Sequence, residues 1–130
     1  MNPAPLDFTT VPSCVYTSPE VASVGLCESK ALEAGYEVRV GKFPFTASGK
    51  ATAAGDRDGF VKLIFDAKTD KLLGAHLVGM NVTEMIGETT LAKMLGATAH
   101  QIAKTIHAHP TMHEAIMEAA EAAHGAAIHI

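Results

Sequence analysis

Histidines are the residues of this 130-residue chain whose types and spacing could do chemistry, and they gather near its end. Six of the seven lie from position 100 onwards: His100, His107, His109, His113, His124 and His129. The stretch 107–114 reads His-Ala-His-Pro-Thr-Met-His-Glu. Because Pro110 cannot continue a helix and disfavours helical backbone just before it, we expect His109 at a bend that precedes a helix.

Glu114 follows on the first turn of that helix, where its carboxylate can reach back toward His109. A carboxylate on one ring nitrogen fixes the tautomer of an imidazole and favours its protonated form, which would make His109 an oriented general base. The spacing Thr111-x-x-Glu114 is also that of a capping box, in which the glutamate has a purely structural role. Both interpretations stay open, and one glutamate can serve in both.

A metal site is a further alternative, because His107, His109 and His113 together could bind zinc. No cysteine or aspartate lies nearby, and Pro110 separates two of the candidate ligands from the third. The pattern therefore favours the histidine–glutamate pair over a metal site. We expect His124 and His129 to lie in a solvated tail.

Composition restricts the remaining classes of function. The net charge of −4 argues against a nucleic-acid partner, which would favour a basic surface. No apolar run approaches the length of a membrane span, so we expect no membrane partner. Cys14 and Cys27 match neither zinc-binding nor redox spacing. There is no Gly-x-Gly-x-x-Gly motif for a dinucleotide. We expect a soluble, cytoplasmic protein with reduced thiols.

The elements that must position the histidines can be read from periodicity and turn residues. Short β-prone pieces are expected between residues 11 and 26, a strand over 37–45, a loop over 46–58, and a hairpin with arms 60–65 and 72–78. The predicted helices cover 29–34, 81–95, 98–106 and 111–124. Strands precede helices without βαβ alternation, which favours an α+β fold: a two-layer sandwich of an antiparallel sheet with helices on one face.

The same periodicity predicts which faces are buried. In the hairpin, one face is shared by Val61, Leu63 and Phe65 on the first arm, and one by Leu73, Ala75 and Leu77 on the second. In the helix 81–95, capped by Asn81, they are Val82, Met85, Ile86 and Thr89. A second stripe with Leu91 and Leu95 predicts that this helix also contacts something else. The last helix should bury Met112, Ile116, Ala119, Ala120 and Ala123, and should expose Glu114, Glu118 and Glu121.

Three separate motifs resemble one family. Residues 16–25 read Tyr-Thr-Ser-Pro-Glu-Val-Ala-Ser-Val-Gly, and the hairpin contains Gly-Phe-Val-Lys-Leu at 59–63 and Leu-Gly-Ala-His-Leu-Val-Gly at 73–79. His109-Pro110-Thr111-x-x-Glu114 follows a His-Ala pair and precedes Met-Glu-Ala-Ala at 117–120. In this order the motifs resemble the C-terminal dimerisation, or interface, domain of pyridine nucleotide–disulfide oxidoreductases, in particular of dihydrolipoamide dehydrogenases.

The resemblance implies a role for each residue of the histidine segment. His109 would exchange protons with the dithiol/disulfide active site of the partner subunit, and Glu114 would orient it. His107, Pro110 and Thr111 would lie near that subunit's flavin, and the bond between His109 and Pro110 would be cis. His113 departs from the small polar residue more common in the family, so a second imidazole would adjoin Glu114.

The resemblance also implies a longer parent enzyme that uses FAD and NAD, although no cofactor is expected in this segment itself. We expect residues 1–10 to be a leader from a preceding domain, 11–124 the dimerisation domain and 125–130 a tail. The partners would be a second copy of the chain and dihydrolipoamide or a lipoyl-bearing protein, and this segment alone would be inactive. A stand-alone dimerisation module remains the alternative.

Overall fold

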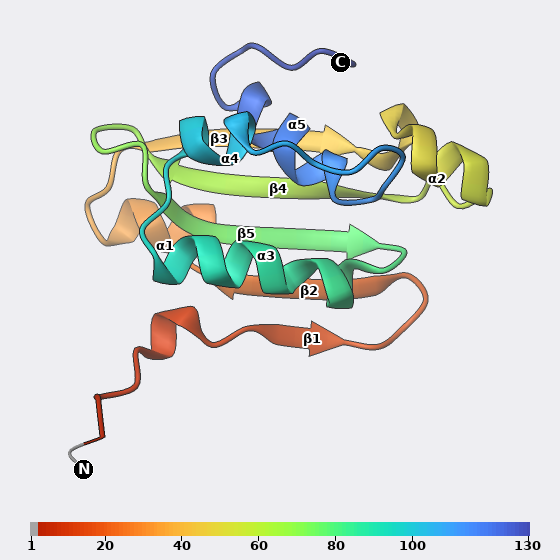
Figure 1. Ribbon diagram of the computed structural model, residues 1–130. Helices are drawn as coiled ribbons and strands as arrows, with labels where there is room; N and C mark the ends of the chain where they lie inside the picture. The colour runs from red at the N-terminus through yellow and green to blue at the C-terminus, as the bar shows by residue number, and fades with distance from the viewer. Residues whose placement is uncertain (1–2) are drawn as a thin grey trace.

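A five-stranded antiparallel sheet forms the centre of the computed structural model, which describes residues 3–130 (Figure 1). The strands lie in the order β1-β2-β5-β4-β3. Their bounds are Ser13–Val15 for β1, Glu20–Gly25 for β2, Val38–Pro44 for β3, Gly59–Asp66 for β4 and Leu72–Gly79 for β5. The predicted hairpin is confirmed as β4 and β5, and Val61 pairs with Leu77 at its middle.

Five α-helices pack around this sheet in the described part of the chain. They are α1 (Glu28–Glu33), α2 (Gly49–Ala54), α3 (Val82–Met94), α4 (Ala99–Lys104) and α5 (Glu114–Ala122). Figure 1 shows α3, α4 and α5 over one face of the sheet, which confirms the predicted α+β sandwich. The short α1 packs on the other face, where Ala31 joins Ile64 and Leu73. Among residues 3–130, no helix has the length and apolar character needed to span a membrane.

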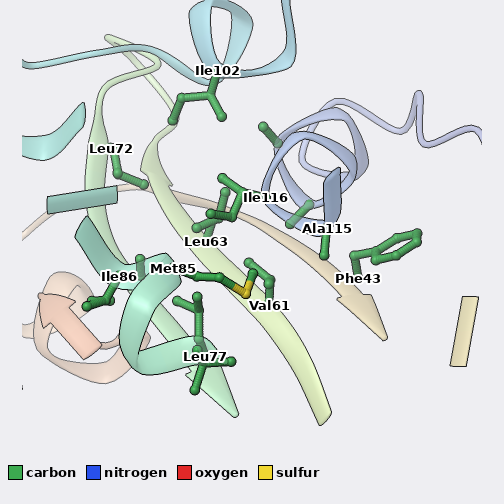
Figure 2. Close-up of a cluster of buried hydrophobic side chains, with 14 of the residues drawn as sticks. Phe43, Val61, Leu63, Leu72, Leu77, Met85, Ile86, Ile102, Ala115 and Ile116 are labelled. Carbon is green, nitrogen blue, oxygen red and sulfur yellow. The ribbon is translucent and has the colours of Figure 1, made fainter. Parts of the chain in front are cut away.

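The main core lies between the sheet and α3, α4 and α5 (Figure 2). Leu63 and Leu77 of the hairpin face Met85 of α3 and Ile116 of α5 in this layer. The four residues predicted to be buried on α3, and the five predicted for the last helix, are all buried. Removing each large apolar side chain from water contributes roughly 1.5–3 kcal/mol to folding. The period of the sequence was therefore sufficient to assign these faces.

The prediction that Leu73 shares a face with Ala75 and Leu77 was wrong, because the hairpin contains a β-bulge. Ile64 pairs with Gly74, whereas the next residue, Phe65, pairs with Leu72. The extra residue on β5 is Leu73, and a bulge of this kind reverses which side chains face the core. Leu72 therefore joins Phe65 in the main core, and Leu73 packs beside Ile64 under α1.

The prediction of a loop over 46–58 was also wrong, because α2 lies within it. The Ser48 hydroxyl accepts a hydrogen bond from the Ala51 N–H at 3.2 Å and so caps the helix. Gly55 ends the helix in the left-handed conformation, with φ at 75°. A serine cap and a closing glycine are ordinary helix boundary signals. Here the glycine- and alanine-rich composition between them concealed a helix of six residues.

The predicted cap of α3 is supplied from another part of the chain. Asn81 precedes the helix, but it adopts φ of 62° and its side chain makes no capping hydrogen bond. Instead, the Glu20 carboxylate on β2 accepts hydrogen bonds from the Thr83 N–H at 3.1 Å and from its hydroxyl at 2.8 Å. Side-chain acceptance of these helical N–H groups is what a cap provides. The capping box of Thr98 and Gln101 at α4 is confirmed as predicted.

Candidate functional site

The predicted histidine segment forms the connection between α4 and α5, and residues 105–113 adopt no regular secondary structure. The bond between His109 and Pro110 is cis. The Thr111 hydroxyl donates a hydrogen bond to the Ala108 carbonyl at 2.7 Å. This hydroxyl does not cap the following helix. The sequence had predicted a helix that begins at Thr111, whereas α5 begins at Glu114. His109 therefore lies in a bend that a threonine closes from within.

His109 and Glu114 are in direct contact across this bend. His109 Nδ1 lies 2.8 Å from Glu114 Oε1, and the Thr111 N–H donates to Glu114 Oε2 at 2.9 Å. An ionised carboxylate only accepts hydrogen bonds, so Nδ1 carries the hydrogen and the Nε2 lone pair of a neutral ring is left available. The His109 side chain is 78% exposed, whereas that of Glu114 is 27% exposed. The pair thus combines an oriented ring with a free basic nitrogen.

The carboxylate of this pair is held in its ionised form. Burial opposes ionisation, but the hydrogen bonds from the Thr111 N–H and the His109 ring outweigh burial, so that the pKa of Glu114 falls below its ordinary value. Glu114 therefore carries a negative charge near neutral pH, directly beside the ring of His109. This is the electrostatic arrangement that a carboxylate-assisted general base requires.

A close approach of α5 to β3 fixes the position of Glu114. A Cβ atom at Gly41 of β3 would lie 1.8 Å from the Ala119 carbonyl oxygen and 2.8 Å from the Ala123 nitrogen. Only glycine leaves room for the helix backbone at this point. The alanines on this side of α5 keep the helix close to the sheet along its length. The first turn of α5, with Glu114 on it, is thereby held against the central layer.

A cavity of about 240 Å³ lies beside the pair and is lined in part by His109, Glu114 and His129 of the C-terminal tail. The sequence placed Glu118 on the outer face of α5, but Glu118 is only 2% exposed. Its carboxylate accepts hydrogen bonds from the Ile128 N–H at 3.0 Å and from His129 Nδ1 at 2.5 Å. That prediction was wrong because the tail folds back over the helix.

The two tail histidines are likewise not simply solvated. His129 binds Glu118 as described, and His124 Nε2 lies 3.0 Å from a carboxylate oxygen of Asp70. Both contacts join segments that are distant along the chain or on different elements. His124 and His129 are both exposed, in agreement with the predicted solvated tail, but no local sequence pattern identifies their carboxylate partners.

The three histidines considered for zinc do not converge. His107 Nε2 lies 2.6 Å from Glu88 Oε1, and His113 Nδ1 lies 2.7 Å from Glu88 Oε2, whereas His109 binds Glu114. Over residues 3–130, no three His, Cys, Asp or Glu side chains are arranged to hold a metal ion. Glu88 was missed as a site residue. Its only signal was its position on α3, in line with Glu84.

The residues expected near a flavin are placed differently from one another. Pro110 is exposed and Thr111 is half-buried, both next to His109. The His107 side chain is turned inward to Glu88 and is only 6% exposed.

Both cysteines, Cys14 and Cys27, are free thiols.

Comparison with known proteins places this chain in a family. Residues 11–120 match the model of the pyridine nucleotide-disulphide oxidoreductase dimerisation domain. The chain is 57% identical over 129 residues to a dihydrolipoyl dehydrogenase of Bacillus subtilis, covering 99% of this chain and 27% of that protein. It is 49% identical over 125 residues to the mitochondrial dihydrolipoyl dehydrogenase of Pisum sativum, covering 96% of this chain and 25% of that protein.

Solved structures agree with this assignment. LpdA from Mycobacterium tuberculosis superposes with a TM-score of 0.85 at 28% identity, covering 91% of this chain and 26% of that one. The HOCl-induced flavoprotein disulfide reductase RclA from Escherichia coli gives 0.82 at 31% identity, covering 85% and 26%. The chain spans about a quarter of the length of the curated relatives it matches. With its fold and histidine–glutamate pair, the chain belongs to the dimerisation domains of the pyridine nucleotide-disulphide oxidoreductases.

Proposed function

We propose that this chain is the dimerisation domain of a dihydrolipoyl dehydrogenase. In this function it joins two subunits and supplies His109 and Glu114 as the acid–base pair for the dithiol/disulfide site of the partner subunit. The observation that carries the proposal is the pair itself: a ring oriented by a largely buried carboxylate at 2.8 Å but otherwise 78% exposed. An oriented yet exposed base is suited to a site that is completed from outside the chain.

In the proposed reaction, His109 Nε2 accepts the proton of one substrate thiol, while Glu114 stabilises the imidazolium that forms. The substrate thiolate then attacks the partner subunit's disulfide, which breaks that bond and forms a mixed disulfide. The second substrate thiol gives its proton to the cysteine thiolate released in the first step, and its sulfur displaces the cysteine of the mixed disulfide. The substrate becomes a cyclic disulfide, and the protein disulfide becomes one thiol and one thiolate. His109 holds or returns the proton beside the resulting thiolate, as expected of a general acid–base group.

FAD and NAD, the cofactors that the family implies for the parent, supply the electron-accepting chemistry when bound. The residues of this chain that we propose beside the partner subunit's flavin are Pro110, which is exposed, and Thr111, which is half-buried. The inward-facing ring of His107 fits that role less well. The proposed substrate is dihydrolipoamide, free or on a lipoyl-bearing protein.

Substitution of the base tests this proposal in the full-length flavoprotein. His109→Gln should lower dithiol oxidation by about 10²–10⁴-fold, the usual contribution of a general acid–base group. Electron transfer between flavin and nicotinamide should change much less, because it requires no thiol proton. His100→Gln is the matched control, since His100 is an exposed histidine on α4. Near-normal dithiol turnover by His109→Gln would leave the domain with an assembly role only.

A further inference from the structure

His109 depends on the rest of its loop for its position. Its ring makes one hydrogen bond, to Glu114, and most of the ring surface faces outward. The backbone that carries it, residues 105–113, lies between the end of α4 and the start of α5 without regular structure. A side chain in such a segment is held in place only as well as its neighbours are anchored.

Glu88 on α3 provides that anchor on both sides of His109. One carboxylate oxygen lies 2.6 Å from His107 Nε2, and the other lies 2.7 Å from His113 Nδ1. His107 precedes His109 by two residues, and His113 precedes Glu114 directly. A single carboxylate of a well-packed helix therefore binds the chain just before the base and just before its orienting residue.

The bond to His107 is charge-assisted. His107 Nδ1 lies 2.9 Å from the Thr105 carbonyl oxygen, and its other nitrogen faces the Glu88 carboxylate. A hydrogen bond with a carboxylate as its partner is charge-assisted. Such bonds are roughly twice as strong as neutral ones. The His107 side chain is 6% exposed, so water competes little for this contact.

We propose that Glu88 is a positioning residue for the acid–base pair, acting through its simultaneous hydrogen bonds to His107 and His113. The inference rests on the proposed function of His109 and deepens it. Glu88 touches neither His109 nor Glu114 in its hydrogen bonds, and its effect passes through the loop backbone. Loss of this anchor would let the loop shift and displace His109. A displacement of about 1 Å in a catalytic group can lower the rate by about 10²-fold.

A double-mutant cycle in the full-length flavoprotein tests the inference. Glu88→Gln keeps the size of the side chain but removes its charge, and should lower kcat for dithiol oxidation by roughly 10–100-fold with little change in KM. In a His109→Gln background the same change should have no further effect, because the residue it positions is gone. Flavin-to-nicotinamide transfer should be unchanged. His113→Ser, which removes one of the two contacts, should give a smaller loss.

Glu84→Gln is the matched control, because Glu84 is exposed one turn earlier on α3 and its side chain makes no hydrogen bond or ion pair within residues 3–130. A crystal structure of Glu88→Gln supplies a readout that does not depend on activity: the contact between His109 Nδ1 and Glu114 should be lost or split between conformers. It should persist in Glu84→Gln.

The outcomes separate this inference from the proposed function. An equal loss of turnover from Glu88→Gln with and without His109 would show that Glu88 acts by another route and would overturn the inference. Full activity of Glu88→Gln beside a strongly impaired His109→Gln would overturn it while leaving the proposed function intact. An unmoved His109 in the crystal structure of Glu88→Gln would overturn the positioning role whatever the activities are.

Discussion

At the scale of single residues, Glu114 performs two tasks that the sequence had presented as alternatives. One oxygen accepts the Thr111 N–H, as a capping glutamate does, and the other binds the His109 ring. Glutamine has a single carbonyl oxygen, so it can replace only one of these contacts. The cap and the orientation of the base can therefore be separated by one substitution.

Glu114→Gln in the full-length flavoprotein should keep the fold and lower dithiol turnover. Its amide oxygen can still accept from Thr111, while its NH₂ group would face the donating Nδ1–H of His109 and break the pair. We expect an altered pH profile of kcat together with the lower rate. If the variant has normal turnover and an unchanged profile, the cap alone accounts for Glu114.

The lowered pKa of Glu114 also predicts how the free energy of unfolding depends on pH. A carboxyl group whose pKa is lower in the folded state stabilises the fold above its unfolded pKa, which is about 4.3 for glutamate. This stabilisation is lost as the pH falls through the folded value. The difference in unfolding free energy between the wild type and Glu114→Gln should therefore shrink between neutral pH and about pH 3. Urea denaturation over this range measures it, and a constant difference would contradict it.

At the scale of elements, the site depends on the contact between β3 and α5. Gly41 lets the α5 backbone approach the strand, and Glu114 stands on the first turn of that helix. The helix is nine residues long, so a shift at its middle also moves its first turn. The geometry of the pair is thus coupled to one glycine on a strand that carries no site residue.

Gly41→Ala should destabilise the protein by roughly 1–3 kcal/mol, the usual cost of an overpacked core. The added methyl group would overlap the Ala119 carbonyl and force α5 away from the sheet. Gly49→Ala is the control, because a Cβ at position 49 meets nothing within 4 Å. Chemical denaturation of the two variants measures the difference. Equal stability would mean that α5 can move outward at little cost.

At the scale of the whole molecule, the outer face of α3 offers an apolar surface. Leu91, Met94 and Leu95 are all more than half exposed, while the opposite stripe of the helix is buried. The sequence had predicted this second stripe and a contact for it. Membership of a family of dimerisation domains makes a second copy of the chain the expected occupant. A two-fold contact would bury each such residue twice.

Leu91→Glu should therefore weaken self-association. If each copy loses about 1.5–3 kcal/mol of apolar burial, the dimer dissociation constant should rise by about 10²–10⁴-fold. Leu32→Glu is the matched control: Leu32 is 54% exposed and Leu91 is 57% exposed, but Leu32 lies on α1, across the sheet. Sedimentation equilibrium distinguishes the two. Equal weakening by both, or by neither, would place the contact elsewhere.

What the sequence by itself determined is the local part of the structure. Apolar periodicity assigned the buried faces of α3 and α5, and turn residues located the β4–β5 hairpin. The spacing of His109, Pro110 and Glu114 placed a histidine and a carboxylate within reach of each other. These features depend on residues a few positions apart, whose relative geometry the backbone period already restricts.

Only the tertiary structure decided which distant groups meet. Glu20 on strand β2 caps helix α3, and Glu88 binds two histidines of the loop before α5. The C-terminal tail folds over Glu118 and buries it. The bulge at Leu73 likewise arises from pairing between strands rather than from either strand alone. Each of these contacts joins segments whose distance in space is set by packing of the whole chain. A pattern of neighbouring residues does not predict that distance, because the distance is fixed only when the sheet and the helices have assembled around one core.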